Sequence, residues 1–247
     1  MKTKSLVILA FIFSSHLYGQ KNDLKKLNLN GKIKSIHEYY QTFTEKDTSK
    51  KSLQTLSYFN HFDKQGNKIE DIKYSPDGKV DKKYEYLYNK FGQRTEQNQY
   101  TSDEKLSRKI TYKYDEKGNI TEDNSYSSEG KLEKKFTYKY DEKGNVIEDM
   151  SFDSNNKLQK KFTHSYDNTG NKIENNRYSA QGTLDKKINY KYNIYMDVIE
   201  EIFTNIDGSK VNYYYEYKYD KKNNWTEKTS CKEKEIISII TREIKYY

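Results

Sequence analysis

A segment of 26 residues recurs along the chain, and this repeat constrains the fold more than any other feature of the sequence. One copy, YKYDEKGNITEDNSYSSEGKLEKKF, begins at Tyr112, and a close relative, YKYDEKGNVIEDMSFDSNNKLQKKF, begins at Tyr138. The Asp or Asn that opens the first turn recurs at Asp63, Asn89, Asp115, Asp141, Asp167, Asn193 and Asp220. A fixed period of this length predicts stacked supersecondary units.

Each copy of the repeat predicts two β-strands. Across residues 131–141, one face bears Leu132, Lys134, Phe136, Tyr138 and Tyr140, and the other bears Glu133, Lys135, Thr137 and Lys139. Alternation with period two over this length is typical of a half-buried strand. The following stretch, residues 145–153, alternates in the same way and predicts the return strand.

The turn sequence predicts how the two strands of a hairpin pair. Residues 141–145, DEKGN, form a three-residue loop with glycine in third place, which predicts a type I turn followed by a left-handed residue at a bulge. The aspartate that opens the turn can accept hydrogen bonds from the turn amides. We expect Tyr140 opposite Val146 and Tyr138 opposite Glu148, so that all large side chains share one face.

This register also predicts ion pairs on the tyrosine-bearing face. Glu148 would lie diagonally from Lys160 on the next strand, within reach of long side chains. The same relation holds for Glu70–Lys82, Glu96–Arg108, Glu122–Lys134 and Glu174–Lys186. Such pairs would offset the cost of charges on an otherwise apolar face. In the alternative interpretation, these charges lie at a solvated rim.

The sequence therefore predicts an all-β fold, an antiparallel meander of roughly sixteen strands made of 26-residue β-hairpins. We expect a long curved sheet, single-layered in part, that curls with its aromatic face inward, because a bare aromatic face invites aggregation. The predicted segments are a signal peptide (1–20), N-terminal atypical capping strands (21–57), six hairpin repeats (58–223) and C-terminal capping strands (224–247).

Composition alone would suggest disorder, and the repeat is what argues against it. Only 33% of the residues are hydrophobic and another 33% are charged, with a formal net charge of +8. Tyrosine, which favours strands, accounts for 26 residues, and there is a single proline. The mixed Lys, Glu and Asp pattern suits solubility more than a dedicated polyanion-binding surface.

The N-terminus predicts export. Two lysines precede an apolar run at residues 6–13, and a polar region follows, which is typical of a secretory signal peptide. We therefore expect a secreted, periplasmic or cell-surface protein, with no integral membrane segment once the signal is removed. Cys231 is the only cysteine, so no intramolecular disulfide can form.

The turns resemble a known family. Asp115-Glu116-Lys117-Gly118-Asn119 after Tyr114, with copies at 140–145 and 166–171, is similar to the tyrosine–aspartate (YD) repeat of the RHS family, over residues 58 to about 225. Asn replaces Asp at Asn89 and Asn193, and Met196 replaces the turn glycine. The resemblance implies a short exported bacterial member built from spiralling hairpins, in a family whose large members enclose toxins or contact surface sugars.

No motif in the sequence predicts catalysis, a cofactor or a metal. His164 takes a place that tyrosine fills in other repeats, and Cys231 is most simply a small buried hydrophobe. The aspartates of the turns lack calcium-loop spacing. Nucleic acid is not expected as a partner, because the lysines near the rings are matched by glutamates. A lipid-embedded barrel conflicts with a Lys or Arg on the predicted apolar face of each central repeat.

Three functional hypotheses follow. The first is a non-catalytic repeat protein of the cell envelope that presents a binding surface to a saccharide or protein, with Tyr86, Tyr112, Tyr138, Tyr190 and Trp225 as candidate stacking residues. The second is an accessory or immunity-type component of a contact-dependent, RHS-like toxin system. The third is a carbohydrate-active enzyme whose site is assembled from Tyr and Glu.

Overall fold

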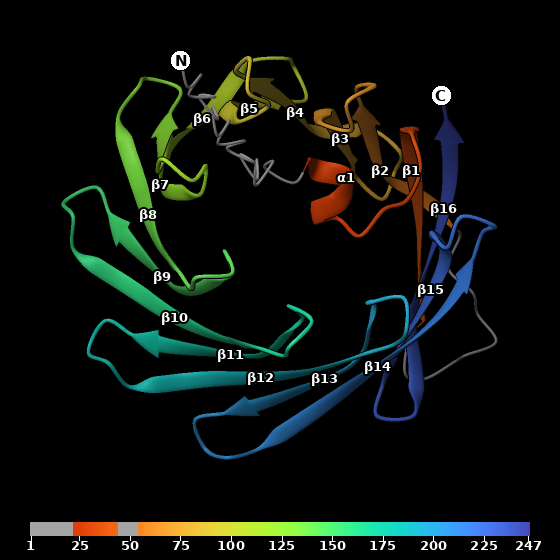
Figure 1. Ribbon diagram of the computed structural model, residues 1–247. Helices are drawn as coiled ribbons and strands as arrows, with labels where there is room; N and C mark the ends of the chain where they lie inside the picture. Colours follow the sequence, from red (N-terminus) through yellow and green to blue (C-terminus); the bar gives the residue numbers. More distant parts are fainter. Residues whose placement is uncertain (1–21, 44–53) are drawn as a thin grey trace, which may run out of the picture.

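The computed structural model describes residues 22–43 and 54–247, which form a closed antiparallel β-barrel of sixteen strands (Figure 1). The predicted signal peptide lies outside the described residues. The elements are α1 (Asp23–Lys26), β1 (Ile33–Thr42), β2 (Thr55–Phe62), β3 (Lys68–Tyr74), β4 (Val80–Tyr88), β5 (Arg94–Thr101), β6 (Leu106–Tyr114), β7 (Ile120–Ser127), β8 (Leu132–Tyr140), β9 (Val146–Asp153), β10 (Leu158–Tyr166), β11 (Lys172–Ser179), β12 (Leu184–Tyr192), β13 (Val198–Asn205), β14 (Lys210–Tyr219), β15 (Trp225–Lys232) and β16 (Glu235–Tyr246).

The antiparallel meander is confirmed, but the long curved sheet, predicted to be single-layered in part, closes into a barrel. Strands β1 and β16 pair along their length, with Ile36 opposite Ile244 and Glu38 opposite Arg242. Closure removes the two free edges that a meander would otherwise expose to other chains. Because its first and last strands pair with each other, neither strand has a free edge.

The turns form as their sequence predicts. The Asp141 amide donates to the Asn145 carbonyl at 2.9 Å, and Gly144 has φ +82°. One carboxylate oxygen of Asp141 accepts from the amides of Lys143 and Asn145 at 2.9 and 2.8 Å. Met196 takes the left-handed position of the turn at 193–197 with φ +64°, although a side chain there is strained.

A bulge beside most turns changes the predicted register. The observed pairs are Tyr140 with Val146, Lys139 with Glu148 and Tyr138 with Asp149. The first pair confirms the prediction, but Ile147 then has no partner, so Tyr138 does not face Glu148. Because side chains alternate between faces, one extra residue sends the remainder of the return strand to the opposite face. The expectation that all large side chains share one face is therefore wrong.

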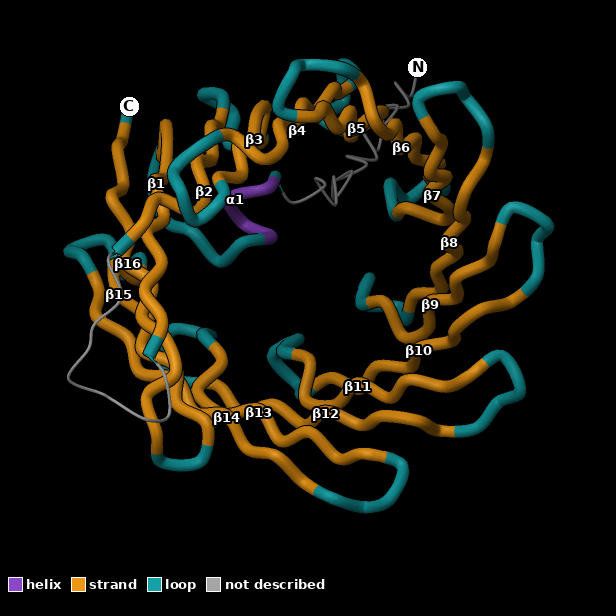
Figure 2. The backbone as a smooth tube through the Cα atoms, turned by 180° about the vertical axis from the view of Figure 1, so that it is seen from behind, coloured by secondary structure: helices purple, strands orange, loops and turns teal. Residues whose placement is uncertain are grey.

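The face with most of the tyrosines points into the barrel. Helix α1 lies inside the ring of strands in both views (Figure 1, Figure 2). Its Asp23 accepts a hydrogen bond from the Tyr88 hydroxyl at 2.5 Å and pairs with Arg94 at 3.1 Å. Tyr86 shares the face of Tyr88, whereas Leu87 between them points outward. Residues directly opposite each other on paired strands share a face of the sheet. The inward or outward orientation of each position can therefore be followed from strand to strand around the barrel.

Ion pairs form on the outer face, one residue away from the predicted partners. Glu148 pairs with Lys139 at 2.7 Å and with Lys161 at 2.8 Å, not with Lys160. The pairs that correspond to Glu148–Lys161 are Lys83–Glu70 (3.2 Å), Lys109–Glu96 (2.9 Å) and Lys187–Glu174 (2.6 Å). The partner differs by one residue because the bulge adds one unpaired residue to the strand. Glu122 instead pairs with Lys113 at 2.7 Å, as Glu148 does with Lys139. The lysines and the arginine that the sequence assigned to these pairs lie on the inner face instead.

A spine of tyrosine hydroxyls joins successive repeats at the inner face. The Tyr114 hydroxyl donates to the Arg94 carbonyl at 2.8 Å, and the same bond recurs once per repeat. The other members are Tyr88–Lys68 (2.6 Å), Tyr140–Ile120 (2.8 Å), Tyr166–Val146 (2.7 Å), Tyr192–Lys172 (2.8 Å) and Tyr217–Val198 (2.7 Å). Each accepting carbonyl belongs to the first or second residue after a turn, where the bulge interrupts the ladder. The tyrosine of the repeat therefore satisfies a carbonyl beside the bulge.

The segment at residues 22–31 crosses part of one mouth of the barrel. Asn22 caps α1 and donates to the Gln65 carbonyl at 2.6 Å, whereas Asn28 donates to the Tyr195 carbonyl at 2.7 Å, across the mouth. Leu24 packs with Leu29, Ile33, Ile36 and Phe62 in a small apolar core. Neither this core nor α1 was predicted. No helix of residues 22–43 or 54–247 has the length and apolarity needed to cross a bilayer.

Replacing Tyr140 with Phe should lower the free energy of unfolding by about 1 kcal/mol, because the Ile120 carbonyl loses its hydroxyl partner. Tyr126→Phe, on the outer face of the adjacent strand β7, is the matched control and should change stability little, since its hydroxyl has no partner among the described residues. Urea unfolding measures both variants. Equal losses would contradict a specific role for the spine.

Candidate binding site in the barrel lumen

A belt of paired polar side chains lines the lumen. In successive repeats, a tyrosine or histidine side chain forms a hydrogen bond with a carboxyl or amide side chain on the preceding strand, most often fifteen residues earlier. The pairs are Tyr86–Asp71 (2.7 Å), Tyr112–Gln97 (3.2 Å), Tyr138–Asp123 (2.5 Å), His164–Asp149 (2.6 Å), Tyr190–Asn175 and Tyr215–Glu201 (2.9 Å). His164 thus replaces a tyrosine of the repeat, as the sequence indicated, and bonds the same kind of acceptor.

Burial sets the protonation of the belt. It raises the pKa of the Asp71 carboxyl despite the nearby Lys68 ammonium. It also raises the pKa of Asp123, with the charges of Asp149 and Glu122 adding to the effect. The phenol of Tyr138 has its pKa raised by burial and by its bond to Asp123. The tyrosines of the belt therefore remain neutral hydroxyl donors at physiological pH.

The structure brings four of the five predicted stacking residues into this belt. Tyr86, Tyr112, Tyr138 and Tyr190 occupy the same position in successive repeats, and their hydroxyls are engaged within the wall. Trp225 lies apart from them, near the turn at 220–224. Its ring covers the Arg242 guanidinium at 3.2 Å from the ring centroid. Neither the four tyrosines nor Trp225 line the pocket described next.

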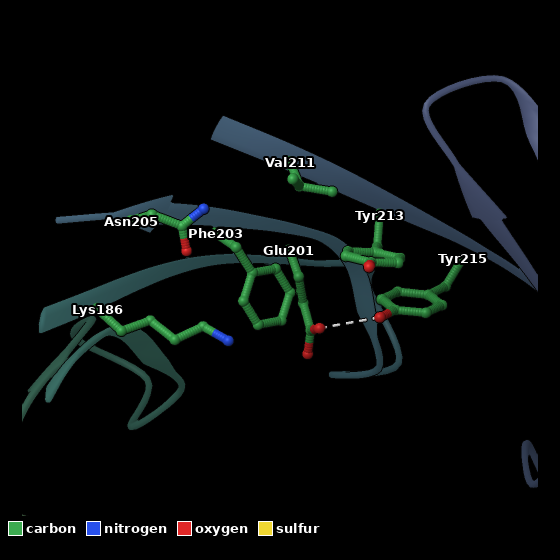
Figure 3. A pocket seen from close by; sticks show the side chains of 7 residues that line it. All are labelled: Lys186, Glu201, Phe203, Asn205, Val211, Tyr213 and Tyr215. Atoms are coloured by element: carbon green, nitrogen blue, oxygen red, sulfur yellow. Dashed lines mark hydrogen bonds between the residues drawn. The ribbon is translucent and has the colours of Figure 1, made fainter. Parts of the chain in front are cut away.

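A pocket of about 220 Å³ opens on the lumen side of β12, β13 and β14 (Figure 3). It is lined by Lys186, Glu201, Phe203, Asn205, Val211, Tyr213 and Tyr215. Phe203 meets Tyr213 edge to face, with ring centroids 5.3 Å apart, and the Lys186 ammonium lies 4.3 Å from the Phe203 centroid. Glu201 accepts from the Tyr215 hydroxyl at 2.9 Å. The pocket thus combines aromatic surfaces with a carboxylate, an amide and an ammonium group.

Departures from the repeat create this pocket. Phe203 stands where earlier repeats have Gln99, Ser125, Ser151 and Arg177. The β13–β14 hairpin also pairs without the register shift that its counterpart β11–β12 has, which brings Tyr213 opposite Glu201. Phe203 and Tyr213 were not predicted as site residues, because they depart from the features that the repeats share. The signal was present in the irregular last copy.

Such an arrangement can bind a ligand that has both apolar faces and polar groups. Ring faces can stack on the apolar faces of a sugar, while Glu201, Asn205 and Lys186 supply hydrogen-bonding groups. No cluster of three metal-binding side chains occurs in the part of the chain that the structure describes. Cys231, expected to be buried, is half-buried on the outer face, because the bulge places its strand position there.

Comparisons with known proteins support the fold. A family model described as "Uncharacterised protein" matches residues 17–165. A porin-like protein from Bacteroides uniformis aligns with 86% of this chain and 98% of its own, at 11% identity and a TM-score of 0.59. A porin-like protein from Bacteroides vulgatus aligns with 85% and 97%, at 13% identity and a TM-score of 0.41. The first likeness shows a shared barrel fold. No curated protein matches the sequence.

Asp123→Asn should make the protein more stable near neutral pH, and the gain should shrink toward pH 4. The pKa of Asp123 is raised in the folded state, so its protonated form contributes to the free energy of unfolding. This contribution is fully present below about pH 4 and is lost as pH rises through the folded-state pKa. Asn removes the buried charge. The experiment is urea unfolding of both proteins at about pH 4 and pH 7.

Asp141→Asn provides a control of opposite sign. Hydrogen bonds from Asn145 and the turn amides lower the pKa of Asp141, so its contribution is full above about pH 4 and is lost as pH falls through the folded-state pKa. This variant should be less stable than the wild type at pH 7, with a smaller difference in acid. The same sign in both variants would contradict the assigned environments.

Proposed function

We propose that this protein has a non-catalytic role in the cell envelope and binds a saccharide inside its barrel. The chain belongs to the family whose model is described as "Uncharacterised protein". The pocket between Phe203, Tyr213 and Glu201 is the observation that supports this proposal most strongly. It places three aromatic rings, a carboxylate and an ammonium group on one concave surface. That surface replaces the exposed sheet face on which the sequence suggested binding.

The lumen offers space and solvent for such a ligand. Barrels of sixteen strands are wide enough to leave an aqueous interior. In agreement, inward residues at the middle of the strands, such as Gln97, Tyr112 and Phe136, retain partial exposure. The segment at residues 22–31 covers part of one mouth. The pocket residue Asn205 begins a turn at the other mouth, so we expect ligand to enter there.

The outer face favours water over lipid. Lipid-facing strands need an apolar band, and a lysine at the middle of the bilayer costs about 2–4 kcal/mol. Here outward lysines paired with glutamates occur on most hairpins, for example Lys109, Lys139 and Lys187. We therefore infer a barrel that stands outside the membrane, although its fold is similar to that of a porin-like protein. The envelope location is supported by the predicted signal peptide.

The other functional hypotheses gain no specific support from the lumen. An accessory role in an RHS-like toxin system stays a prediction based on the turn sequence. A carbohydrate-active enzyme would need two carboxyl groups placed about a scissile bond. Glu201 is the one carboxylate among the residues that line the pocket, and it is bonded to Tyr215.

Tyr213→Ala should weaken saccharide binding by about tenfold or more, because a stacking surface of the pocket is lost. The matched control is Tyr214→Ala, since Tyr214 is the next residue on the same strand and faces outward, 38% exposed. Glycan-array screening identifies a ligand, and calorimetry then measures its affinity for the three proteins. Equal affinity of both variants and the wild type would contradict a lumen site.

A further inference from the structure

We infer that the saccharide held in the lumen is acidic, and that Lys228 and Arg242 receive its carboxylate. This inference rests on the proposed function, which it deepens by naming the class of sugar. It derives from two cations on the inner face of β15 and β16, next to the pocket. Both have donor capacity that the described residues leave unused.

Lys228 is a lumen cation without an ion-pair partner. No carboxylate of residues 22–43 or 54–247 lies within the 4.0 Å of its ammonium that an ion pair requires. The ammonium rests against rings instead, 4.0 Å from the Tyr215 centroid and 5.9 Å from that of Tyr217. Burial lowers its pKa, and the charges of Glu201, Asp197 and Glu38 oppose that shift from a distance. An incoming carboxylate would give this charge a direct partner.

Arg242 provides a second donor. Its Nε and Nη2 both donate to one oxygen of Glu38, at 2.8 and 2.7 Å, while Nη1 is buried without a partner among the described residues. The guanidinium is held flat by Trp225 on one side. Because Nη1 has almost no accessible surface, a ligand oxygen reaches it only if the guanidinium shifts. A buried N–H group left unpaired is unfavourable, so a shift that pairs Nη1 with a ligand oxygen would contribute binding energy. In this inference Trp225 positions Arg242, whereas its predicted role in stacking on a ligand stays a prediction.

Tyr215 connects Lys228 to the pocket. Its ring lines the pocket on one side and contacts the Lys228 ammonium at 4.0 Å. A sugar ring placed against Phe203 and Tyr213 would therefore need to extend only past Tyr215 to bring a carboxylate to Lys228. Hydrogen bonds to charged groups are stronger than neutral ones, which makes the charge a determinant of specificity.

The charges of the pocket itself agree with an anionic ligand. Lys186, like Lys228, has no carboxylate within ion-pairing distance among the described residues, and its ammonium lies over Phe203. Glu201 is the one carboxylate of the lining, and the Tyr215 hydroxyl donates to it. A neutral sugar would leave both ammonium groups without a directly paired carboxylate.

The test compares tetragalacturonate with its fully methyl-esterified form, which has the same backbone without the charges. Calorimetry with the mature protein should show at least about tenfold tighter binding of the acid. Lys228→Met keeps the apolar stem of the side chain and should abolish most of this preference. Lys139→Met, on the outer face, is the control and should retain it. Thermal unfolding confirms that each variant is folded.

The outcomes separate the inference from the proposed function. Equal binding of acid and ester, both weakened by Tyr213→Ala, would overturn the acidic class and leave the lumen site standing. An undiminished preference for the acid in Lys228→Met would overturn the assignment of the carboxylate to this cation. Binding of neither form would overturn the inference and count against the proposed saccharide site as well.

Discussion

The bulge beside the turns is the constraint on which the rest of the structure depends. It adds one unpaired residue to a strand, so residues that share a parity in the sequence point to opposite sides of the wall. Tyr138 thus faces the lumen beside Asp149, while Lys139 faces solvent beside Glu148. The same bulge disturbs the ladder next to a carbonyl that the spine tyrosine then satisfies, as Tyr140 does for Ile120. The bulge therefore links the turn sequence, the strand register and the position of the spine tyrosine.

The two faces of the wall have different physical roles. Outside, lysine–glutamate pairs in water contribute little to stability, about 0–1 kcal/mol each, but they keep the surface soluble and hydrated. Inside, hydroxyls and acids bond each other across neighbouring strands, and burial raises the pKa of Asp71 and Asp123. The apolar core is small and is confined to the junction of α1 with β1 and β2. A barrel with so little apolar core depends on its hydrogen-bonded wall and on closure.

The sequence predicted the strands, the turns and the meander because these follow from local period and turn chemistry. It did not predict the register, since the expected Glu148–Lys160 pair ignored the residue that the bulge adds, and the observed partner is Lys161. Closure depends on β1 meeting β16, a contact between the two ends of the chain that no local pattern encodes. The stacking tyrosines were placed in the lumen wall, but the pocket arises where Phe203 and Tyr213 depart from the repeat.

The central claim, a closed wall with the tyrosine-bearing face inside, can be tested by thiol labelling in a Cys231→Ser background. Gln97→Cys would lie on the lumen face of β5 and Lys109→Cys on the outer face of β6. The account predicts that a small maleimide labels both thiols, whereas a bulky polyethylene-glycol maleimide labels only position 109. Rapid labelling of position 97 by the bulky reagent would mean that this face is not enclosed.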